Sequence, residues 1–447
     1  DVPRSWRVAT ALPRAASMRY AASGAAMLLD TPIMLGALHV WSFADGGVSY
    51  HVAYWPSPAA RAFDTTTFVD ALHRLARAAV EVFRAAPMRD YWFLVQDGAG
   101  DALEHSTSVV IGVQSANLAA SVYASRTEIA HEFFHTWNLV AMRPASYNEL
   151  RYRPPARTPN LWVGEGLTLY YADALWRRAG AADTSVSRLA RLANLYARYL
   201  SSPGIRSTSP ERASLAFGDR PVDNPDATGG YYLQGELLGN VIDALVRDST
   251  HDAHGLDDVM RVLYRQSRRD PGRGYTSDDV RAAVDSACSC RSAALFEREV
   301  QRPGLIDIAP AVARLGLALV VDTIAAADAN GNPSPDLRVG FDFPDGGGPA
   351  RLVLNNPASA WFAAGLRTGD TLVSVNGVSL ASFADVQRVL ATLRARSEVR
   401  VAVRRTAGVN EIVVRLNPFT RPRVRFVEHE AVTDAQRGRR AGWLLGR

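Results

Sequence analysis

The chain has 447 residues, of which 47% are apolar and 21% charged. This length exceeds what one hydrophobic core usually organises, so we expect two or three domains and exclude a disordered or fibrous body. The formal net charge is only +5, and every side chain counted as Lys or Arg is arginine. Because this small excess is spread along the chain, we expect neither nucleic-acid binding nor, without a run of 18 apolar residues, a membrane span.

The first hundred residues combine strand and helix patterns. Residues 48–55 and 91–95 have the composition of strands, and residues 67–85 between them carry apolar side chains at helical spacing. These patterns predict a mixed α/β segment.

The middle of the chain, from about residue 125 to 300, is dominated by helical patterns. Within it, residues 201–230 are rich in Ser, Pro, Gly and Asp and predict a long loop. After Pro303 and Gly304 the pattern changes to short strands and glycine turns. We therefore place one domain boundary near residue 305 and another near residue 418, before an Arg-rich tail.

The strongest signal for chemistry is the run His131-Glu132-Phe133-Phe134-His135. On a helix, residues four apart lie one above the other, so both imidazoles can reach one metal ion. The glutamate beside the first histidine then points at the water on that metal. This spacing predicts a zinc site with Glu132 as its general base.

Catalytic zinc takes three protein ligands and leaves its fourth position to water. The best candidate for the third ligand is Glu165, because its neighbours in the run 161–171 are almost all apolar or glycine. A solvated surface glutamate would not be expected in such surroundings. The sequence thus predicts one Zn²⁺ ion held by His131, His135 and Glu165.

Several segments of the chain resemble the glycyl aminopeptidases with a PDZ domain, a family of gluzincin metallopeptidases. HEFFHTWNLVAMRP at 131–144 is similar to the family's His-Glu-Tyr-Phe-His-x-Trp-Asn run, which ends in Arg-Pro. The segment 161–171 matches its Leu-Trp-x-x-Glu-Gly-x-Thr-x-Tyr-Tyr pattern. Residues 103–105 and 231–235 are similar to its Leu-Glu-His and Tyr-Tyr-x-Lys-Gly motifs, and 255–261 also fits.

The resemblance implies an α+β protein with a thermolysin-like, two-lobed zinc peptidase, made of a mixed α/β lobe and a helical lobe, followed by a PDZ β-domain. It suggests four parts: a remnant of an N-terminal β-domain, the catalytic domain, the PDZ domain and an Arg-rich tail, at 1–12, 13–305, 306–418 and 419–447. We expect the chain to retain only the last stretch of that N-terminal β-domain.

The resemblance also implies roles for further residues. Tyr232 would donate to the oxyanion that forms during hydrolysis, with Tyr231 as the alternate and as a substrate-binding residue. Glu104 would bind the free α-amino group of a peptide, a role that a carboxylate fills by charge-assisted hydrogen bonding. The role of His105 stays open.

The chain departs from the family pattern at three places. Val140 and Ala141 replace a basic pair, Asp101 and Ala102 replace Gly-Gly, and Gln234 replaces lysine. None of these changes touches the predicted metal site. They put substrate preference and rate in doubt.

Residues 337–416 resemble a PDZ domain. Val339, Gly340 and Phe341 lie in the segment similar to its carboxylate-binding loop, whose backbone N–H groups can bind a peptide C-terminus. The helix expected over 383–393 does not begin with histidine, so selectivity that depends on one is not supported. The groove between the sheet edge and this helix either binds a peptide or packs against the catalytic domain.

Three functions compete. The first is an aminopeptidase that removes N-terminal residues from peptides, with glycine or alanine preferred by family resemblance. The second is a zinc endopeptidase with the same metal site, and the third is a PDZ peptide-binding protein whose peptidase has lost activity. The intact His131-to-His135 run and Glu165 argue against the third. The natural substrate, the oligomeric state and the compartment stay open.

Overall fold

We describe the protein from a computed structural model, which describes all residues except 1, 2, 4, 17, 18, 149–155, 181–186, 227–229 and 344–348. Residues 1, 2 and 4 of the predicted N-terminal remnant, and 227–229 of the predicted long loop, therefore lie outside the described residues. In the described part, no helix combines the length and apolar character needed to cross a membrane.

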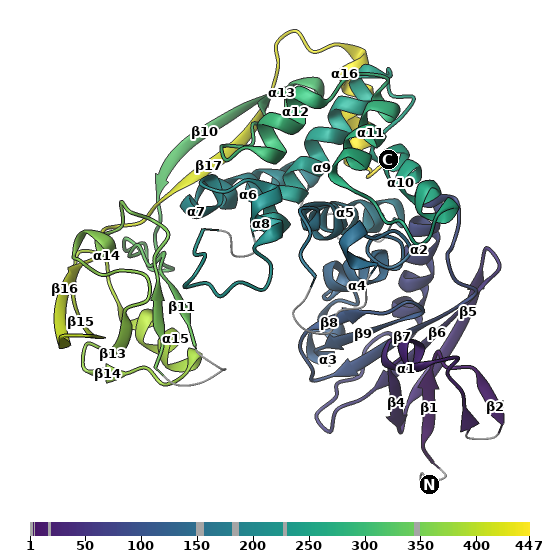
Figure 1. The fold of residues 1–447 in the computed structure, drawn as a ribbon, viewed down its shortest axis with the longest axis horizontal. Helices are drawn as coiled ribbons and strands as arrows, with labels where there is room; N and C mark the ends of the chain where they lie inside the picture. The colour runs from purple at the N-terminus through teal and green to yellow at the C-terminus, as the bar shows by residue number, and fades with distance from the viewer. Residues whose placement is uncertain are drawn as a thin grey trace.

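A five-stranded sheet forms the core of the N-terminal region, in the order β5-β6-β7-β9-β8 (Figure 1). Strands β6, β7 and β9 run parallel, whereas the outer strands β5 and β8 run antiparallel to their neighbours. β8 ends this order and is a short edge strand. The strands are β5 (His39–Asp45), β6 (Val48–Trp55), β7 (Asp90–Asp97), β8 (Ala102–Glu104) and β9 (Ser108–Val113).

Helix α2 (Thr65–Phe83) covers one face of this sheet because it buries an apolar stripe that includes Phe68, Leu72 and Leu75. Asp64 caps it by accepting from the backbone N–H of Thr67. Residues from β1 and β4 pack on the other face. The remaining N-terminal elements are β1 (Arg7–Thr10), β2 (Arg14–Ala16), β3 (Arg19–Tyr20), α1 (Ala25–Leu29) and β4 (Ile33–Gly36).

A helical region follows, built around α9 (Gly230–Ser249), which is buried on nearly every side. Helices α4 (Arg126–Phe134) and α5 (Thr168–Arg178) lie between α9 and the sheet and share its hydrophobic core. The other elements are α3 (Ser115–Ala120), η1 (Ala145–Tyr147), η2 (Trp162–Leu167), α6 (Arg188–Leu200), α7 (Pro203–Arg206), α8 (Pro210–Leu215), α10 (Leu256–Arg269), α11 (Ser277–Cys288), α12 (Ala293–Phe296), η3 (Glu297–Gln301) and α13 (Ala309–Arg314). Just after α11, Cys290 forms a disulfide with Cys288.

The predicted PDZ region lies at the end of a two-stranded ribbon, β10 (Leu317–Ala325) and β17 (Thr420–Glu428) (Figure 1). Its sheet has the order β11-β12-β13-β15-β16 and a hydrophobic core of its own. The elements are β11 (Gly340–Asp342), β12 (Arg351–Val353), α14 (Ala360–Ala363), β13 (Thr371–Val375), β14 (Val378–Ser379), α15 (Phe383–Thr392), β15 (Glu398–Arg405) and β16 (Gly408–Arg415).

After β17 the chain returns to the helical region as α16 (Asp434–Leu444). Trp443 is buried there, and Arg188 lies over its ring at 4.5 Å. Residues of the predicted tail thus form a strand and a packed helix. The division into domains itself stays a prediction.

Three polar contacts between described residues join the PDZ region to the helical region directly, one of them from Asn355 Nδ2 to the carbonyl oxygen of Pro225 at 3.4 Å. Arg220 donates to Asp342 Oδ2 at 2.7 Å, and Arg338 donates to the carbonyl oxygen of Ser201 at 3.2 Å. The PDZ region is therefore connected to the helical region by the two strands of the ribbon and by these side-chain contacts.

Candidate metal centre

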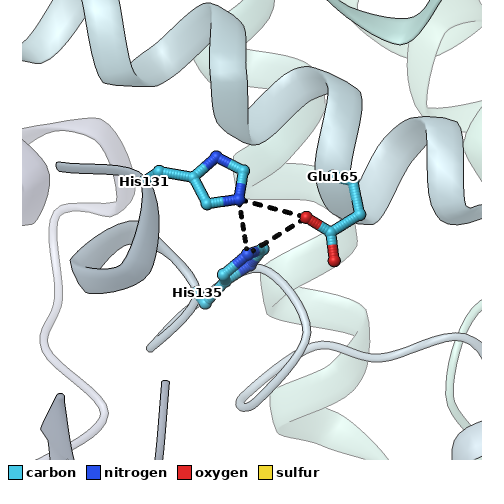
Figure 2. A group of neighbouring side chains, drawn as sticks. All are labelled: His131, His135 and Glu165. Carbon is cyan, nitrogen blue, oxygen red and sulfur yellow. Dashed lines mark hydrogen bonds and ion pairs between the residues drawn. The ribbon is translucent and has the colours of Figure 1, made fainter. Parts of the chain in front are cut away.

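Helix α4 presents the first two predicted ligands on one face. Ile129 and Phe133 are buried, and Phe133 meets the ring of Tyr91 on the sheet edge-to-face, with 5.0 Å between the ring centroids. This packing fixes the rotation of the helix. His131 and His135, one turn apart, consequently lie on one face, and both imidazoles point toward Glu165 (Figure 2).

The third side chain comes from η2, a π-helical turn that leads into α5. Such turns occur frequently at functional sites. Here two glycines allow a close approach, because a Cβ on Gly166 would lie 2.3 Å from Gly235 Cα on α9. The contact holds Glu165 against the start of α9, where the two predicted tyrosines lie.

The three side chains converge on one point (Figure 2). Glu165 Oε2 lies 3.1 Å from His131 Nε2 and 3.3 Å from His135 Nε2, and the two nitrogens are 3.0 Å apart. Tetrahedral zinc with ligand bonds of about 2.0–2.1 Å would hold its ligand atoms about 3.3 Å apart. The three donors therefore fit a zinc ion in both chemistry and spacing.

Asn138 supports this arrangement. Its carbonyl oxygen accepts from His135 Nδ1 at 2.8 Å, which leaves the lone pair on Nε2 free for a metal. Its Nδ2 donates to the carbonyl oxygens of Val163 and Gly164 and to Thr168 Oγ1. Asn138 thus ties the end of α4 to the turn that carries Glu165. The sequence predicts no role for Asn138, although it lies in the Trp-Asn part of the matched motif.

The electrostatic environment favours a cation at the point of convergence. Burial opposes the charged form of His135, but the Glu165 carboxylate outweighs this and raises the pKa of His135 to about 9. Burial raises the pKa of Glu132 to about 7, and the charges of Glu104 and Glu165 add to the shift although His135 opposes it. Three carboxylates therefore surround two imidazoles in a largely dry site.

Both predicted tyrosines lie at this site. The ring of Tyr232 is 6.2 Å from that of His131 and 4.7 Å from that of Tyr231, measured between centroids. Burial and the nearby Glu165 carboxylate raise the pKa of each phenol, to about 12 for Tyr231. Each phenol therefore keeps its proton and can donate a hydrogen bond.

Glu104 ends the edge strand β8, which packs against α4. Its charge acts on His131, Glu132 and His135. The structure thus brings Glu104 into the field of the metal site, as its predicted role requires. His105 beside it faces Asp30, with 3.8 Å between His105 Nδ1 and Asp30 Oδ1.

Two departures from the family pattern have a structural account. Asp101 stands where the family has glycine and adopts a left-handed φ of 63°, a conformation that aspartate tolerates better than most residues. Buried Gln234 stands where the family has lysine and donates to the carbonyl oxygen of Thr208 at 3.0 Å. Neither change disturbs the convergence of the three candidate ligands.

Val339, Gly340 and Phe341 lie away from the metal site, in the PDZ region. Val339 precedes the edge strand β11, and Gly340 and Phe341 begin it. The side chains of Val339 and Phe341 pack partly against the PDZ core. The structure therefore places the predicted loop at a free sheet edge, separate from the catalytic groups.

Comparison with known proteins supports these observations. Residues 125–238 match the M61 glycyl aminopeptidase family, and residues 362–405 match the PDZ domain family. The first match contains α4, η2 and the start of α9, and so all three converging side chains. The comparison with curated proteins gives no match.

Among solved structures, an aminopeptidase N family protein from Idiomarina loihiensis is 19% identical and has a TM-score of 0.74; the alignment covers 98% of this chain and 77% of that chain. An M1 zinc metallopeptidase from Deinococcus radiodurans is 16% identical, with a TM-score of 0.40 and coverage of 64% and 58%. A two-domain M1 zinc metallopeptidase variant bound to L-tryptophan is 17% identical, with a TM-score of 0.43 and coverage of 68% and 63%.

The likeness to the Idiomarina protein shows a shared fold. A mixed α/β protein with a PDZ domain, as predicted from the sequence, is confirmed. The predicted enzyme class, a zinc metallopeptidase, is confirmed by the family match over the segment that holds the three converging side chains. The chain is therefore similar to the M61 glycyl aminopeptidase family over residues 125–238 and to the PDZ domain family over residues 362–405.

Proposed function

We propose that this protein is an aminopeptidase that uses one zinc ion to hydrolyse N-terminal residues from peptides. The observation that carries the proposal is the convergence of His131 Nε2, His135 Nε2 and Glu165 Oε2 within 3.3 Å of one another. These three residues would hold the ion. Bound there, zinc would act as a Lewis acid toward the scissile carbonyl and lower the pKa of its water to about 7.

Glu132 is the general base in this proposal. It follows His131 on α4 and lies among the catalytic groups, half-buried. Its carboxylate takes a proton from the attacking water and gives it to the leaving amine. Its raised pKa favours the second of these transfers.

Tyr232 stabilises the oxyanion, because its half-buried phenol keeps a proton to donate and lies beside His131. Tyr231, whose ring lies beside it, contacts the substrate. The negative charge of Glu104 at the sheet edge attracts the free α-amino group, and the carboxylate accepts hydrogen bonds from it. This contact fixes the peptide by its first residue. Family resemblance suggests glycine or alanine as that residue.

The architecture that we propose is thermolysin-like and two-lobed. The five-stranded sheet with α2 would be one lobe and the helices around α9 the other, with α4 and Glu165 between them. The proposed parts remain 1–12, 13–305, 306–418 and 419–447.

For the PDZ region we propose binding of a peptide C-terminus. β11 is an edge strand, so an extended peptide can pair with it while Val339, Gly340 and Phe341 receive the carboxylate. Phe383 opens α15 and is 60% exposed, which offers an apolar contact to the last side chain of such a peptide.

A release assay tests the aminopeptidase proposal. Free peptides that differ in their first residue are compared with the same peptides acetylated at the N-terminus, each with and without a zinc chelator. We expect release of the first residue from free peptides only, fastest for glycine and alanine, and none with chelator. Internal cleavage of acetylated peptides would instead identify an endopeptidase, and no cleavage at all would leave a PDZ binding protein.

A further inference from the structure

A cavity of about 290 Å³ lies among α4, α5, α6 and α9, and arginine dominates its charged lining. Its wall holds four guanidinium groups and two carboxylates. The arginines are Arg126, Arg177, Arg191 and Arg198, and the acids are Asp173 and Glu236.

Two of the four arginines are accounted for by the packing of the helices. Arg177 donates to Asp173 at 2.9 Å within α5, and Arg191 on α6 donates to Glu236 on α9 at 2.5 Å. The first pair lies within α5 and the second links α6 to α9, and together they satisfy both acids. A purely structural role explains them.

The other two arginines are not explained in this way. Among the residues that the structure describes, no carboxylate pairs with Arg126 or Arg198. Arg198 is exposed and Arg126 half-buried, so both can turn their guanidinium groups toward a ligand in the cavity. The cavity therefore has an excess of positive charge that the fold does not use.

The wall of the cavity lies one helical turn from residues of the metal centre on two helices. Thr127 in its wall precedes His131 by one turn on α4, and Glu236 follows Tyr232 by one turn on α9. Four helical residues rise about 6 Å, and residues four apart share one face. Two extended peptide residues span about 7 Å, so a chain cut at the metal reaches this wall with its second residue after the cut.

The charges on the two sides of the metal centre are opposite. Glu104 lies on the sheet side, on the β8 strand that packs against α4. Arg198 lies on α6, in the helical region (Figure 1). A short peptide has the same polarity, with an ammonium group at one end and a carboxylate at the other.

We propose that this cavity binds the α-carboxylate of the substrate through Arg126 and Arg198, so that the enzyme selects tripeptides with both termini free. The inference rests on the proposed aminopeptidase function and names its substrate class. A guanidinium group suits the task because it presents paired donors to a carboxylate.

The test compares Gly-Ala-Ala with Gly-Ala-Ala amide, which differ only in the terminal charge. We expect the wild-type kcat/KM to favour the acid by about tenfold, mainly through KM, as one charge-assisted contact would give. In the double variant Arg126→Gln with Arg198→Gln this ratio falls to near one. Arg437→Gln on α16, an exposed arginine paired with Asp434, is the matched control and keeps the ratio.

A binding measurement supplements the kinetics. Calorimetry with Glu132→Gln, which should not turn over the peptides, is expected to show about tenfold weaker binding of the amide. Equal kcat/KM for the two wild-type substrates, or a preference that survives the double variant, would overturn the inference while leaving the aminopeptidase intact. Failure of the wild type to release glycine from either peptide would overturn the proposed function, and the inference with it.

Discussion

The metal centre and the PDZ groove use their residues in different ways. At the metal centre, three donors from two elements meet within 3.3 Å, burial raises the pKa of Glu132, and the Glu165 carboxylate raises the pKa of His135. The PDZ groove has no such cluster among the described residues, and offers a free strand edge and an exposed Phe383. The first arrangement suits bond cleavage, and the second suits recognition of an extended chain.

The largest effect is expected from Glu132→Gln, which tests whether the metal centre cleaves peptide bonds. Glutamine keeps the shape and hydrogen bonding of the side chain but cannot accept a proton. We expect kcat to fall about a thousandfold while zinc content stays at the wild-type level. Steady-state kinetics and metal analysis of the same preparation check this. A rate within tenfold of the wild type would remove Glu132 from the mechanism.

Tyr232→Phe is expected to have the next largest effect. The phenylalanine ring retains the packing against His131 and Tyr231 but loses the donor, so kcat should fall about a hundredfold with little change in KM. Tyr231→Phe is the matched control on the adjacent residue and should change kcat less. A larger loss from Tyr231→Phe would exchange the roles of the two tyrosines.

Asn138→Ala tests a residue that touches no substrate in this account. Alanine removes the Nδ2 contacts to Val163, Gly164 and Thr168, so the Glu165 turn is held less firmly. We expect zinc affinity to fall about tenfold to a hundredfold, with activity restored at high zinc concentration. Competition with a chelator of known affinity measures this. Unchanged affinity would show that Asn138 does not position the site.

The smallest effect is expected from a substitution in the PDZ region, and it concerns peptide binding. Phe383→Ala should weaken binding of a peptide C-terminus about threefold to tenfold, because one exposed aromatic contact is lost. Val413→Ala, an exposed apolar position on the opposite edge strand β16, is the matched control. Fluorescence anisotropy with a library of labelled peptides compares the two. Equal affinities for both variants would mean that the groove at α15 does not hold peptide.

Residues close together in sequence were the easiest to predict. His131, Glu132 and His135 lie within one turn of helix, so their spacing alone predicts a shared metal. Glu165 required a second signal, its apolar and glycine-rich surroundings. The role of Asn138 escaped prediction because it depends on contact with a turn 25 residues later, which the spacing of side chains along α4 does not reveal.

The fold could be predicted only in part for a similar reason. The periodicity of residues 48–95 indicates strands and a helix, and these elements are observed. The arginines of the cavity are scattered over three helices. The sequence around each of them predicts only a solvated side chain. The sequence predicts a charged tail for residues 420–444, but pairing of β17 with β10 and burial of Trp443 depend on partners about 100 residues away or more.

Zinc content measured on purified wild-type protein and on Glu165→Ala tests the central claim most directly. The account predicts one zinc ion per wild-type chain and loss of most of that zinc in the variant, because only His131 and His135 remain as ligands. Circular dichroism of both proteins checks that the variant is folded. Full zinc occupancy in a folded Glu165→Ala protein would contradict the account, since the third ligand would then have to lie elsewhere.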